Sequence, residues 1–395
     1  MRAMCRALRL APLLFGAATL VAGCGNSSNP LASPSIDAAS GAAPDGSSVA
    51  DAGNDSAAPS TGCINDGDPF AVAALRDRVS FFASTALAGR GPGTAADRAA
   101  RAAIEERFRC LGLTAGADGG GYEQAFVDDA GNSTANLVGF VQGTDPVVGA
   151  EVVVIGAHHD HLGVARGVVY PGANDNASGI TALLAVAQAI QAGPNKPRRT
   201  IAFVAFGAEE SGFEGSTFYV AHPPRALPLA RVVYMINLDM VGSHSVENTV
   251  YALGSFADTP ARALLVQEGR VHPTISLSLG EPGDSSDHMP FCGRAIPYVF
   301  FWTPGGSCYH ESCDTADRID YAPMSEIARV VAGLTRGLAD STVDLAAQRR
   351  TQGFTCNGSA RRELTPDRRR GPRQNPTEQH NPSRLRASHA APRHD

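Results

Sequence analysis

Histidines and acidic residues follow several apolar runs of the sequence, at or just after the point where each run ends. Five positions of this kind stand out: H-H-D-H at 158–161, Asp175, Glu209 with Glu210, Asp239 and His310. Carboxylates brought together repel one another and lose hydration unless a cation joins them. Imidazole and carboxylate ligands without paired thiolates suit Zn²⁺ or a similar divalent ion. Each cluster alone is a weak signal, but five in this order predict a metal centre.

The apolar runs must supply the elements that position these side chains. They have the length of β-strands and are apolar on both faces, as central strands of a helix-covered sheet are: 137–141, 152–157, 201–206, 232–238 and 298–302. Helical stretches are expected at 70–83, 95–111, 180–191, 213–221 and 324–338. We therefore expect an α/β sandwich whose mixed, mostly parallel central sheet is flanked by helices. Ligand sites in such folds gather on loops at the carboxyl ends of strands.

Five segments resemble metallopeptidase family 28, which contains bacterial leucyl aminopeptidases, glutamate carboxypeptidases and glutaminyl cyclases. They are V-I-G-A-H-H-D-H-L-G, P-G-A-N-D-N-A-S-G, E-E-S-G-F-E-G-S, N-L-D-M-V-G and S-D-H-M-P-F. The similarity extends from about residue 70 to about residue 340 and includes L-A-G-R near Leu87. The resemblance implies the three-layer fold of zinc exopeptidases, without room for the protease-associated insert of some members.

The resemblance also implies a centre of two zinc ions per chain. Asp175 would bridge both ions, His158 and Asp239 would complete one of them, and Glu210 and His310 would complete the other.

Two further acidic residues receive catalytic roles from the same resemblance. Asp160 would accept a hydrogen bond from the His158 imidazole and fix its tautomer. Glu209 would be the general base. The metal ions would lower the pKa of an attacking water towards neutrality, and Glu209 would take its proton and return it to the leaving amine.

Several nearby residues are interpreted as structural. His159 and His161 flank the ligand His158, and we expect them to be packing or loop histidines. Asp287 and His288 belong to a motif near the cleft, where a structural or substrate-orienting role is favoured over ligation. Ser285 lies in a G-D-S-S string that faintly resembles a nucleophile motif, but no base is assigned to it.

The ends of the chain differ from its middle. The apolar run 10–22 follows three Arg residues, is too short to span a bilayer and closes with L-V-A-G-C. Small residues before Cys24 resemble the lipobox of bacterial lipoproteins, although an ordinary signal peptide that contains a Cys is the alternative. We expect a signal peptide at 1–23, a disordered tether at 24–62, one zinc peptidase domain at 63–359 and a disordered basic tail at 360–395. The expected location is the bacterial cell envelope, through a lipid on Cys24, or the secreted fraction.

The net charge of −6 combines a basic C-terminal tail with a more acidic middle of the chain. Residues 360–395 contain nine Arg and four acidic residues, so the folded part is distinctly acidic. This acidity argues against a nucleic-acid partner. The tail could bind an acidic lipid or polymer, although an adventitious tail is the simpler interpretation.

The cysteines fit an oxidising compartment. Cys5 and Cys24 belong to the leader, and an even set of six remains, which predicts up to three disulfides. Cys308 and Cys313 straddle His310, so a bond between them would hold that ligand in place, whereas metal binding by the two thiolates is the alternative. The remaining trial pairings are Cys63 with Cys110 and Cys292 with Cys356.

Together these features predict an exported zinc exopeptidase, and among exopeptidases an aminopeptidase acting on peptides with a free N-terminus. A monomer is expected. A carboxypeptidase would need a basic clamp for the terminal carboxylate, and Arg166 and Arg318 form no evident clamp. Three alternatives stay open: a glutaminyl cyclase or a carboxypeptidase on the same scaffold, and a non-catalytic envelope lipoprotein that binds a ligand.

Overall fold

The computed structural model describes residues 67–243, 249–256, 259–280, 282–283, 285–351 and 356. The predicted signal peptide with Cys24, the tether, Cys63 and the basic tail lie outside the described residues. Within the described part of the chain, no helix is both long and apolar enough to cross a membrane.

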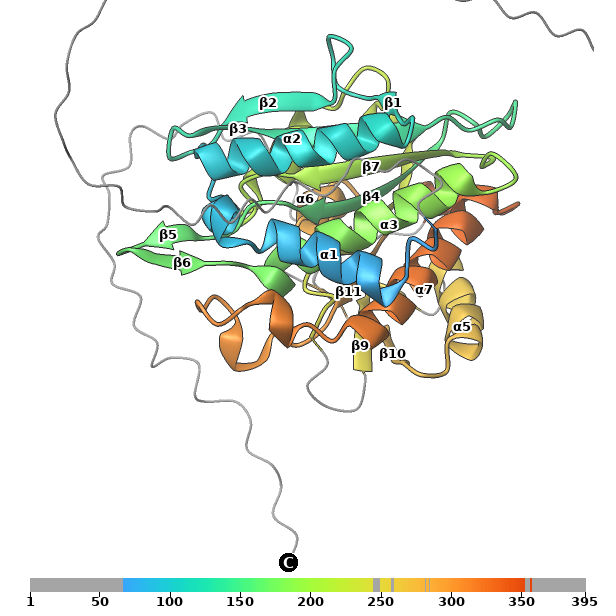
Figure 1. Cartoon of the computed structure of the whole chain (residues 1–395). Coiled ribbons are helices and arrows are strands. Elements are labelled where there is room, and N and C mark those ends of the chain that lie inside the picture. Colours follow the sequence, from blue (N-terminus) through green and yellow to red (C-terminus); the bar gives the residue numbers. More distant parts are fainter. Residues whose placement is uncertain are drawn as a thin grey trace, which may run out of the picture. The chain divides into compact units, whose positions relative to one another are not determined.

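A mixed sheet of nine strands forms the centre of the fold, in the order β1-β3-β7-β4-β8-β11-β9-β10, with β2 also paired to β3 (Figure 1). Its strands are β1 Thr114–Ala115, β2 Glu123–Val127, β3 Ser133–Val141, β4 Val152–His158, β7 Thr200–Phe206, β8 Val232–Leu238, β9 Thr249–Leu253, β10 Ser276–Leu279 and β11 Tyr298–Trp302. The neighbours β7, β4, β8 and β11 are parallel. The pairs β1–β3, β2–β3, β3–β7 and β9–β11 are antiparallel, and β9–β10 is parallel. The predicted mixed sheet is confirmed, and its parallel part lies mainly at the centre.

Helices cover both faces of this sheet. The helices are α1 Val72–Phe82, α2 Ala95–Cys110, α3 Gly179–Ala192, α4 Glu214–Ala221, α5 Pro260–Val271, α6 His288–Cys292, α7 Tyr321–Asp340 and α8 Leu345–Thr351. Side chains of α1, α2, α3, α5 and α7 pack into one core cluster with strand residues, and α4 and α6 pack into a second one. In Figure 1, α1, α2, α3 and α7 lie in front of the sheet and α6 lies behind it. The predicted α/β sandwich is thus confirmed as three layers.

The central strands are long apolar runs because both of their faces are covered. Every residue of β4, β7 and β8 is buried. A strand that is buried on both faces gains nothing from alternating polar residues. The histidines and acidic residues that follow these strands come where each strand leaves the sheet, and there the candidate site begins.

Helix α2 shows how local sequence sets an element that later supports the site. The Thr94 hydroxyl accepts the backbone N–H of Asp97 at 3.1 Å, which caps the helix. Its buried face includes Ala96, Ala100, Ile104 and Phe108, spaced four residues apart. The sequence alone predicts Ala99, Ala103, Phe108 and Leu111 for this face. Phe108 and Leu111 are buried, whereas Ala99 and Ala103 are more exposed, because the larger Ile104 decides with Phe108 which side turns inward.

Candidate metal centre

All five predicted ligands converge at the carboxyl ends of the parallel strands. His158 is the last residue of β4, and Asp239 directly follows β8. Glu210 lies in the loop between β7 and α4, His310 lies in the loop after β11, and Asp175 lies in the irregular turn Ala173–Ser178 that precedes α3. The order of the strands places these loops side by side.

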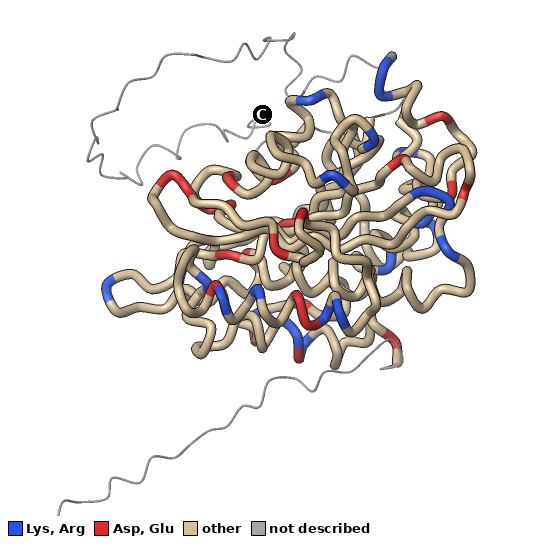
Figure 2. Tube along the Cα trace, turned by 90° about the horizontal axis from the view of Figure 1, so that it is seen from above, with Lys and Arg blue, Asp and Glu red and all other residues tan. Residues whose placement is uncertain are grey.

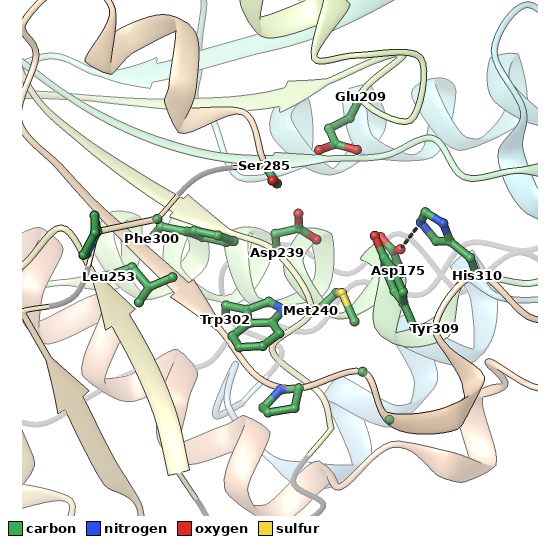
Figure 3. A pocket seen from close by; sticks show the side chains of 15 residues that line it. Asp175, Glu209, Asp239, Met240, Leu253, Ser285, Phe300, Trp302, Tyr309 and His310 are labelled. Carbon is green, nitrogen blue, oxygen red and sulfur yellow. Dashed lines mark ion pairs between the residues drawn. The ribbon is translucent and has the colours of Figure 1, made fainter. Parts of the chain in front are cut away.

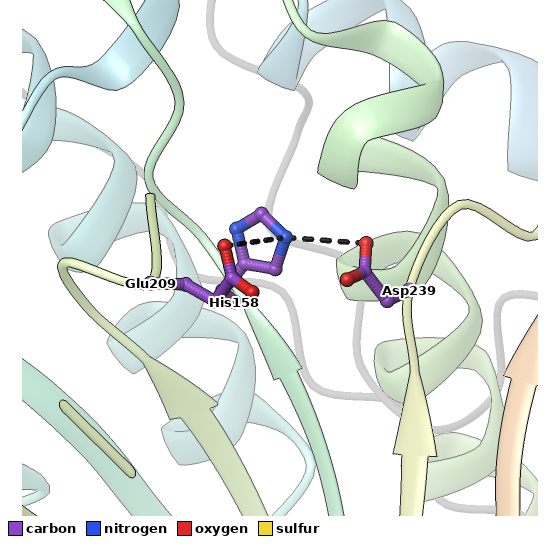
Figure 4. Close-up of side chains that lie close together, drawn as sticks. All are labelled: His158, Glu209 and Asp239. Carbon is purple, nitrogen blue, oxygen red and sulfur yellow. Dashed lines mark hydrogen bonds and ion pairs between the residues drawn. The ribbon is translucent and has the colours of Figure 1, made fainter. Parts of the chain in front are cut away.

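The first group of side chains surrounds His158. Its Nε2 atom lies 3.2 Å from Asp239 Oδ1, 3.3 Å from Asp175 Oδ1 and 3.8 Å from Glu209 Oε2. Figure 4 shows the imidazole between Glu209 and Asp239. One ring nitrogen carries at most one hydrogen, so it cannot satisfy three carboxylates. A divalent cation can, and the ligand atoms of His158, Glu209 and Asp239 lie within 4.8 Å of one another.

The second group surrounds His310. Its Nε2 atom lies 3.0 Å from Glu210 Oε2 and 3.2 Å from Asp175 Oδ2. Asp175 thus turns one oxygen to His158 and the other to His310. A carboxylate placed in this way can join two cations, so the residues present fit two divalent ions with nitrogen and oxygen ligands, as zinc prefers.

Burial and mutual charge shift the pKa values of this cluster strongly. Burial raises the pKa of Glu209 well above its ordinary value, and burial also raises that of Asp239. Burial opposes a charge on His310, but hydrogen bonds to Asp175 and Glu210 raise its pKa to about 10. Burial would raise the pKa of Asp175 as well, yet hydrogen bonds from His158 and His310 hold it below its ordinary value. Figure 2 shows acidic positions close together near the middle of the view.

The predicted contact between Asp160 and the His158 imidazole is present, and the backbone oxygen of Asp160 is the nearer of its two partners. His158 Nδ1 lies 3.2 Å from the backbone oxygen of Asp160 but 3.7 Å from its carboxylate Oδ1. Since the chain leaves β4 at His158, the backbone oxygen two residues on comes within reach first. The Asp160 carboxylate also accepts the backbone N–H groups of Glu209, at 3.0 Å, and Glu210, at 3.3 Å. Asp160 therefore positions the His158 ring through its backbone and the glutamate loop through its side chain.

The two flanking histidines are both fully buried but face different partners. His159 Nε2 lies 3.1 Å from Asp97 Oδ1, away from the predicted ligands. His161 Nδ1 lies 2.6 Å from Glu210 Oε1, inside the cluster. The sequence predicts the same role, that of a packing or loop histidine, for both, because H-H-D-H does not show in which direction each side chain leaves the loop.

Two supporting residues were not predicted. The Asp314 carboxylate accepts the backbone N–H of Asn174, at 2.9 and 3.0 Å, and that of Asp175, at 3.0 Å. The fully buried Arg90 donates to the backbone oxygens of four residues, Phe82, His159, Pro171 and Gly172. Both residues lie beside features that the sequence analysis singled out. Arg90 ends the L-A-G-R motif, and Asp314 directly follows Cys313, the second cysteine of the pair that flanks His310.

The S-D-H motif supports the centre from the far side of Asp239. The Ser286 hydroxyl donates to Asp239 Oδ2 at 2.8 Å and accepts from Asn237 Nδ2 at 2.8 Å. Burial raises the pKa of Asp287 to about 7. The His288 ring packs on aromatic rings of the sheet, with centroids 4.6 Å apart for Phe300. The packing of His288 fits a structural role, one of the two roles predicted for the motif.

Two predicted disulfides are present. Cys308 is bonded to Cys313, which closes the short loop that contains His310, and Cys292 is bonded to Cys356. Cys110 is also disulfide-bonded, and its predicted partner Cys63 lies outside the described residues.

A cavity of about 400 Å³ opens beside the cluster. Figure 3 shows an acidic end and an apolar wall, and the described lining residues are Asp175, Glu209, Asp239, Met240, Leu253, Pro282, Gly283, Ser285, Phe300, Trp302, Pro304, Gly305, Gly306, Tyr309 and His310. None of these described lining residues is a Lys or an Arg.

Residues 136–335, half of the chain, match peptidase family M28. The chain belongs to this family. The matched M28 segment contains all five predicted ligands together with Glu209, Asp160 and His161. Helices α1 and α2 and the motif with Arg90 precede it.

The comparisons with M28 relatives and solved structures are partial. The chain is 35% identical over 159 residues to "Aminopeptidase YwaD" of Bacillus subtilis, covering 38% of this chain and 32% of that protein. It spans 48% of "Leupeptin-inactivating enzyme 1" of Streptomyces exfoliatus, at 28% identity over 51% of this chain. The chain thus spans less than half the length of these curated relatives. The structure of the Legionella pneumophila LapA aminopeptidase matches with a TM-score of 0.55 and 20% identity, over 69% of this chain and 73% of that one. This last likeness shows the fold alone.

Proposed function

We propose that this M28 chain is a zinc-dependent exopeptidase, and among exopeptidases an aminopeptidase that hydrolyses the first bond of peptides with a free N-terminus. The observation that carries the proposal is the placement of Asp175, whose two oxygens face His158 and His310. Two cation-binding groups that share one carboxylate, beside a buried glutamate, are the parts that hydrolysis by an activated water requires.

The ligand assignment follows the two groups. His158 and Asp239 would hold one zinc ion, Glu210 and His310 would hold the other, and Asp175 would contribute an oxygen to each, which would give two ions per chain. Bound zinc lowers the pKa of water and polarises the scissile carbonyl. The carboxylates that crowd these positions supply the negative charge that such ions need.

Glu209 is the general base of the proposed reaction. It lines the cavity, and its Oε2 atom lies 3.8 Å from His158 Nε2. Because burial raises the pKa of Glu209, the carboxylate is basic enough to take a proton from the attacking water. The same carboxyl group then delivers the proton to the leaving amine.

The lining of the cavity is evidence for a substrate whose N-terminal residue has an apolar side chain. Leu253 and Trp302 belong to its apolar wall, next to the end that carries the proposed zinc ligands Asp175 and Asp239 (Figure 3). A carboxypeptidase would need a cation for the terminal carboxylate, and the described lining offers no Lys or Arg. The lining therefore favours the aminopeptidase over the carboxypeptidase.

We also propose that the enzyme acts outside the cytoplasm. The arginines and the apolar run before Cys24, and the small residues that precede it, support export and a lipid anchor at that cysteine. The disulfides at Cys308–Cys313 and Cys292–Cys356 suit an oxidising compartment. A monomer that binds no nucleic acid stays a prediction.

The test begins with purified residues 25–359 and a count of bound zinc. We expect two zinc ions per chain, and hydrolysis of leucine anilide but not of its N-acetylated form. Equal rates on free and blocked substrates would exclude an aminopeptidase. One bound zinc together with cyclisation of N-terminal glutamine would identify a glutaminyl cyclase. A folded protein without zinc or activity would favour the binding lipoprotein.

A substitution separates catalysis from metal binding. Glu209→Gln should lower kcat by about 10²- to 10⁴-fold while both zinc ions stay bound. The matched control is Glu311→Gln, since Glu311 is exposed beside His310. This control should keep normal kcat and zinc content. A Glu209→Gln variant with normal kcat would show that another group accepts the proton.

A further inference from the structure

His161 occupies a position in the centre that the ligand assignment leaves without a role. Its side chain is fully buried, and its Nδ1 atom lies 2.6 Å from Glu210 Oε1. The other oxygen of this carboxylate, Oε2, lies 3.0 Å from His310 Nε2. The Glu210 carboxylate is therefore divided between two imidazoles, one buried and one that opens to the cavity.

The distances distinguish a hydrogen bond from a shared metal ion. Two ligands of one tetrahedral zinc, each about 2.0–2.1 Å from the ion, lie about 3.3 Å apart. The pairs His158–Asp239 at 3.2 Å and His158–Asp175 at 3.3 Å agree with this spacing. His161, Asp175 and Glu210 together could hold a cation, but the 2.6 Å between His161 Nδ1 and Glu210 Oε1 is shorter than this spacing and close to the length of a charge-assisted hydrogen bond. The distance from His161 Nδ1 to Asp175 Oδ2 is longer, at 3.9 Å.

The surrounding backbone keeps the His161 ring in this orientation. A Cβ atom on Gly172 would lie 2.5 Å from His161 Cγ, and Gly172 has a φ of +61°. Only glycine allows the backbone to approach the ring so closely in this conformation. The Gly172 carbonyl is itself held by Arg90 Nη2 at 2.9 Å. The ring therefore has little room to turn another atom towards Glu210.

We propose that His161 is a positioning residue, whose Nδ1–H holds Glu210 Oε1 so that only Oε2 is presented to the zinc ion shared with His310. This inference rests on the zinc centre of the proposed function. It gives the two histidines that flank Asp160 different roles. His161 sets which oxygen of Glu210 faces the zinc ion, whereas His159 contacts Asp97 and none of the proposed zinc ligands.

The experiment compares His161→Asn with His161→Gln. The Asn amide N–H can occupy the place of Nδ1, whereas the longer Gln places its amide near the Nε2 position. We measure zinc stoichiometry and affinity by chelator competition, and the Tm of each metal-free variant shows that it is folded. His161→Gln should weaken one of the two zinc ions by about 10- to 100-fold, and His161→Asn should restore most of that loss. His159→Gln is the matched control and should bind both ions normally.

The outcomes separate this inference from the proposed function. Equal losses in the Asn and Gln variants would show that an N–H group at the Nδ1 position does not hold Glu210, and would overturn the positioning role. Normal zinc affinity in both variants, or the same loss in His159→Gln, would also overturn it while the proposed function stands. A wild-type protein that binds no zinc would overturn both together.

Discussion

At the residue scale, the carboxylates of the centre stabilise the charged forms of its imidazoles in the metal-free protein. His310 has a pKa of about 10, because its hydrogen bonds to Asp175 and Glu210 outweigh the effect of burial. The contribution of His310 to the stability of the metal-free protein is thus complete below its unfolded pKa of about 6.5. It is lost as the pH rises towards 10. The pKa of His158 is raised as well, where Glu209 and Asp239 outweigh burial.

Zinc that binds to the proposed ligands should therefore displace protons from them. We expect zinc addition at about pH 7 to release protons from His158 and His310, since metal ligands must be deprotonated. The apparent zinc affinity should rise with pH up to the pKa of His310. Calorimetry in two buffers of different ionisation enthalpy measures the number of protons released. An enthalpy that is the same in both buffers would contradict the expectation.

At the element scale, what the sequence predicts depends on how strongly an element is buried. The strands β4 and β7 could be predicted, because burial on both faces makes each a continuous apolar run. The helix α7 could be predicted, because burial of one stripe of its surface makes apolar residues recur at helical spacing. Strands β9 and β10 could not be predicted in the same way, since they are short and only partly buried. Their place at the edge of the sheet comes from pairing with β11 and with each other.

The ligands could be predicted at the same scale, but the contacts between loops could not. Four of the five ligands follow an apolar run, Asp175 lies in the loop P-G-A-N-D-N-A-S-G before a helix, and the resemblance to known motifs assigns the role of each. The bonds of Asp160 to Glu209 and of His161 to Glu210 join residues 49 positions apart in the chain. Such pairings depend on loop paths, for which neither hydrophobic periodicity nor spacing carries a signal.

Arg90 shows how one side chain joins several elements. Its guanidinium donates to Phe82 at the end of α1, to His159 where the chain leaves β4, and to Pro171 and Gly172 before the Asp175 turn. Burial lowers the pKa of Arg90 to about 10, so the group stays charged near neutral pH. The charge and the donors lie behind the metal centre, where they hold three segments in place.

Replacing Arg90 should destabilise the fold. Arg90→Met leaves four buried carbonyl oxygens without their donor, so we expect the free energy of unfolding to fall by about 3–5 kcal/mol. Arg225→Met is the control, because the Arg225 side chain is 93% exposed and its ion pair with Asp118 is long, at 3.8 Å. The control should change stability by less than about 0.5 kcal/mol. Urea unfolding of the metal-free proteins measures both, and equal losses would show that Arg90 has no special structural role.

At the scale of the whole molecule, the unit that builds the site is larger than the segment that matches the family. The match at 136–335 omits α1, α2, β1 and β2. Yet β2 pairs with β3, and Phe108 of α2 lies in the same core cluster as Leu137 of β3. Arg90 also precedes the match. The domain predicted at 63–359 includes all of these parts.

Truncation distinguishes the two boundaries. A fragment of residues 63–359 should keep the Tm of the full chain and its kcat/KM on leucine anilide, because it retains the sheet, both helix layers and Cys356. A fragment of residues 136–335 should fail to fold cooperatively, since it exposes the Leu137 side of the core and loses the buried guanidinium of Arg90. Thermal unfolding followed by circular dichroism, together with the anilide assay, measures both fragments. A cooperative and active 136–335 fragment would show that the N-terminal helices are dispensable, and an unfolded 63–359 fragment would show that the domain needs residues beyond the predicted boundaries.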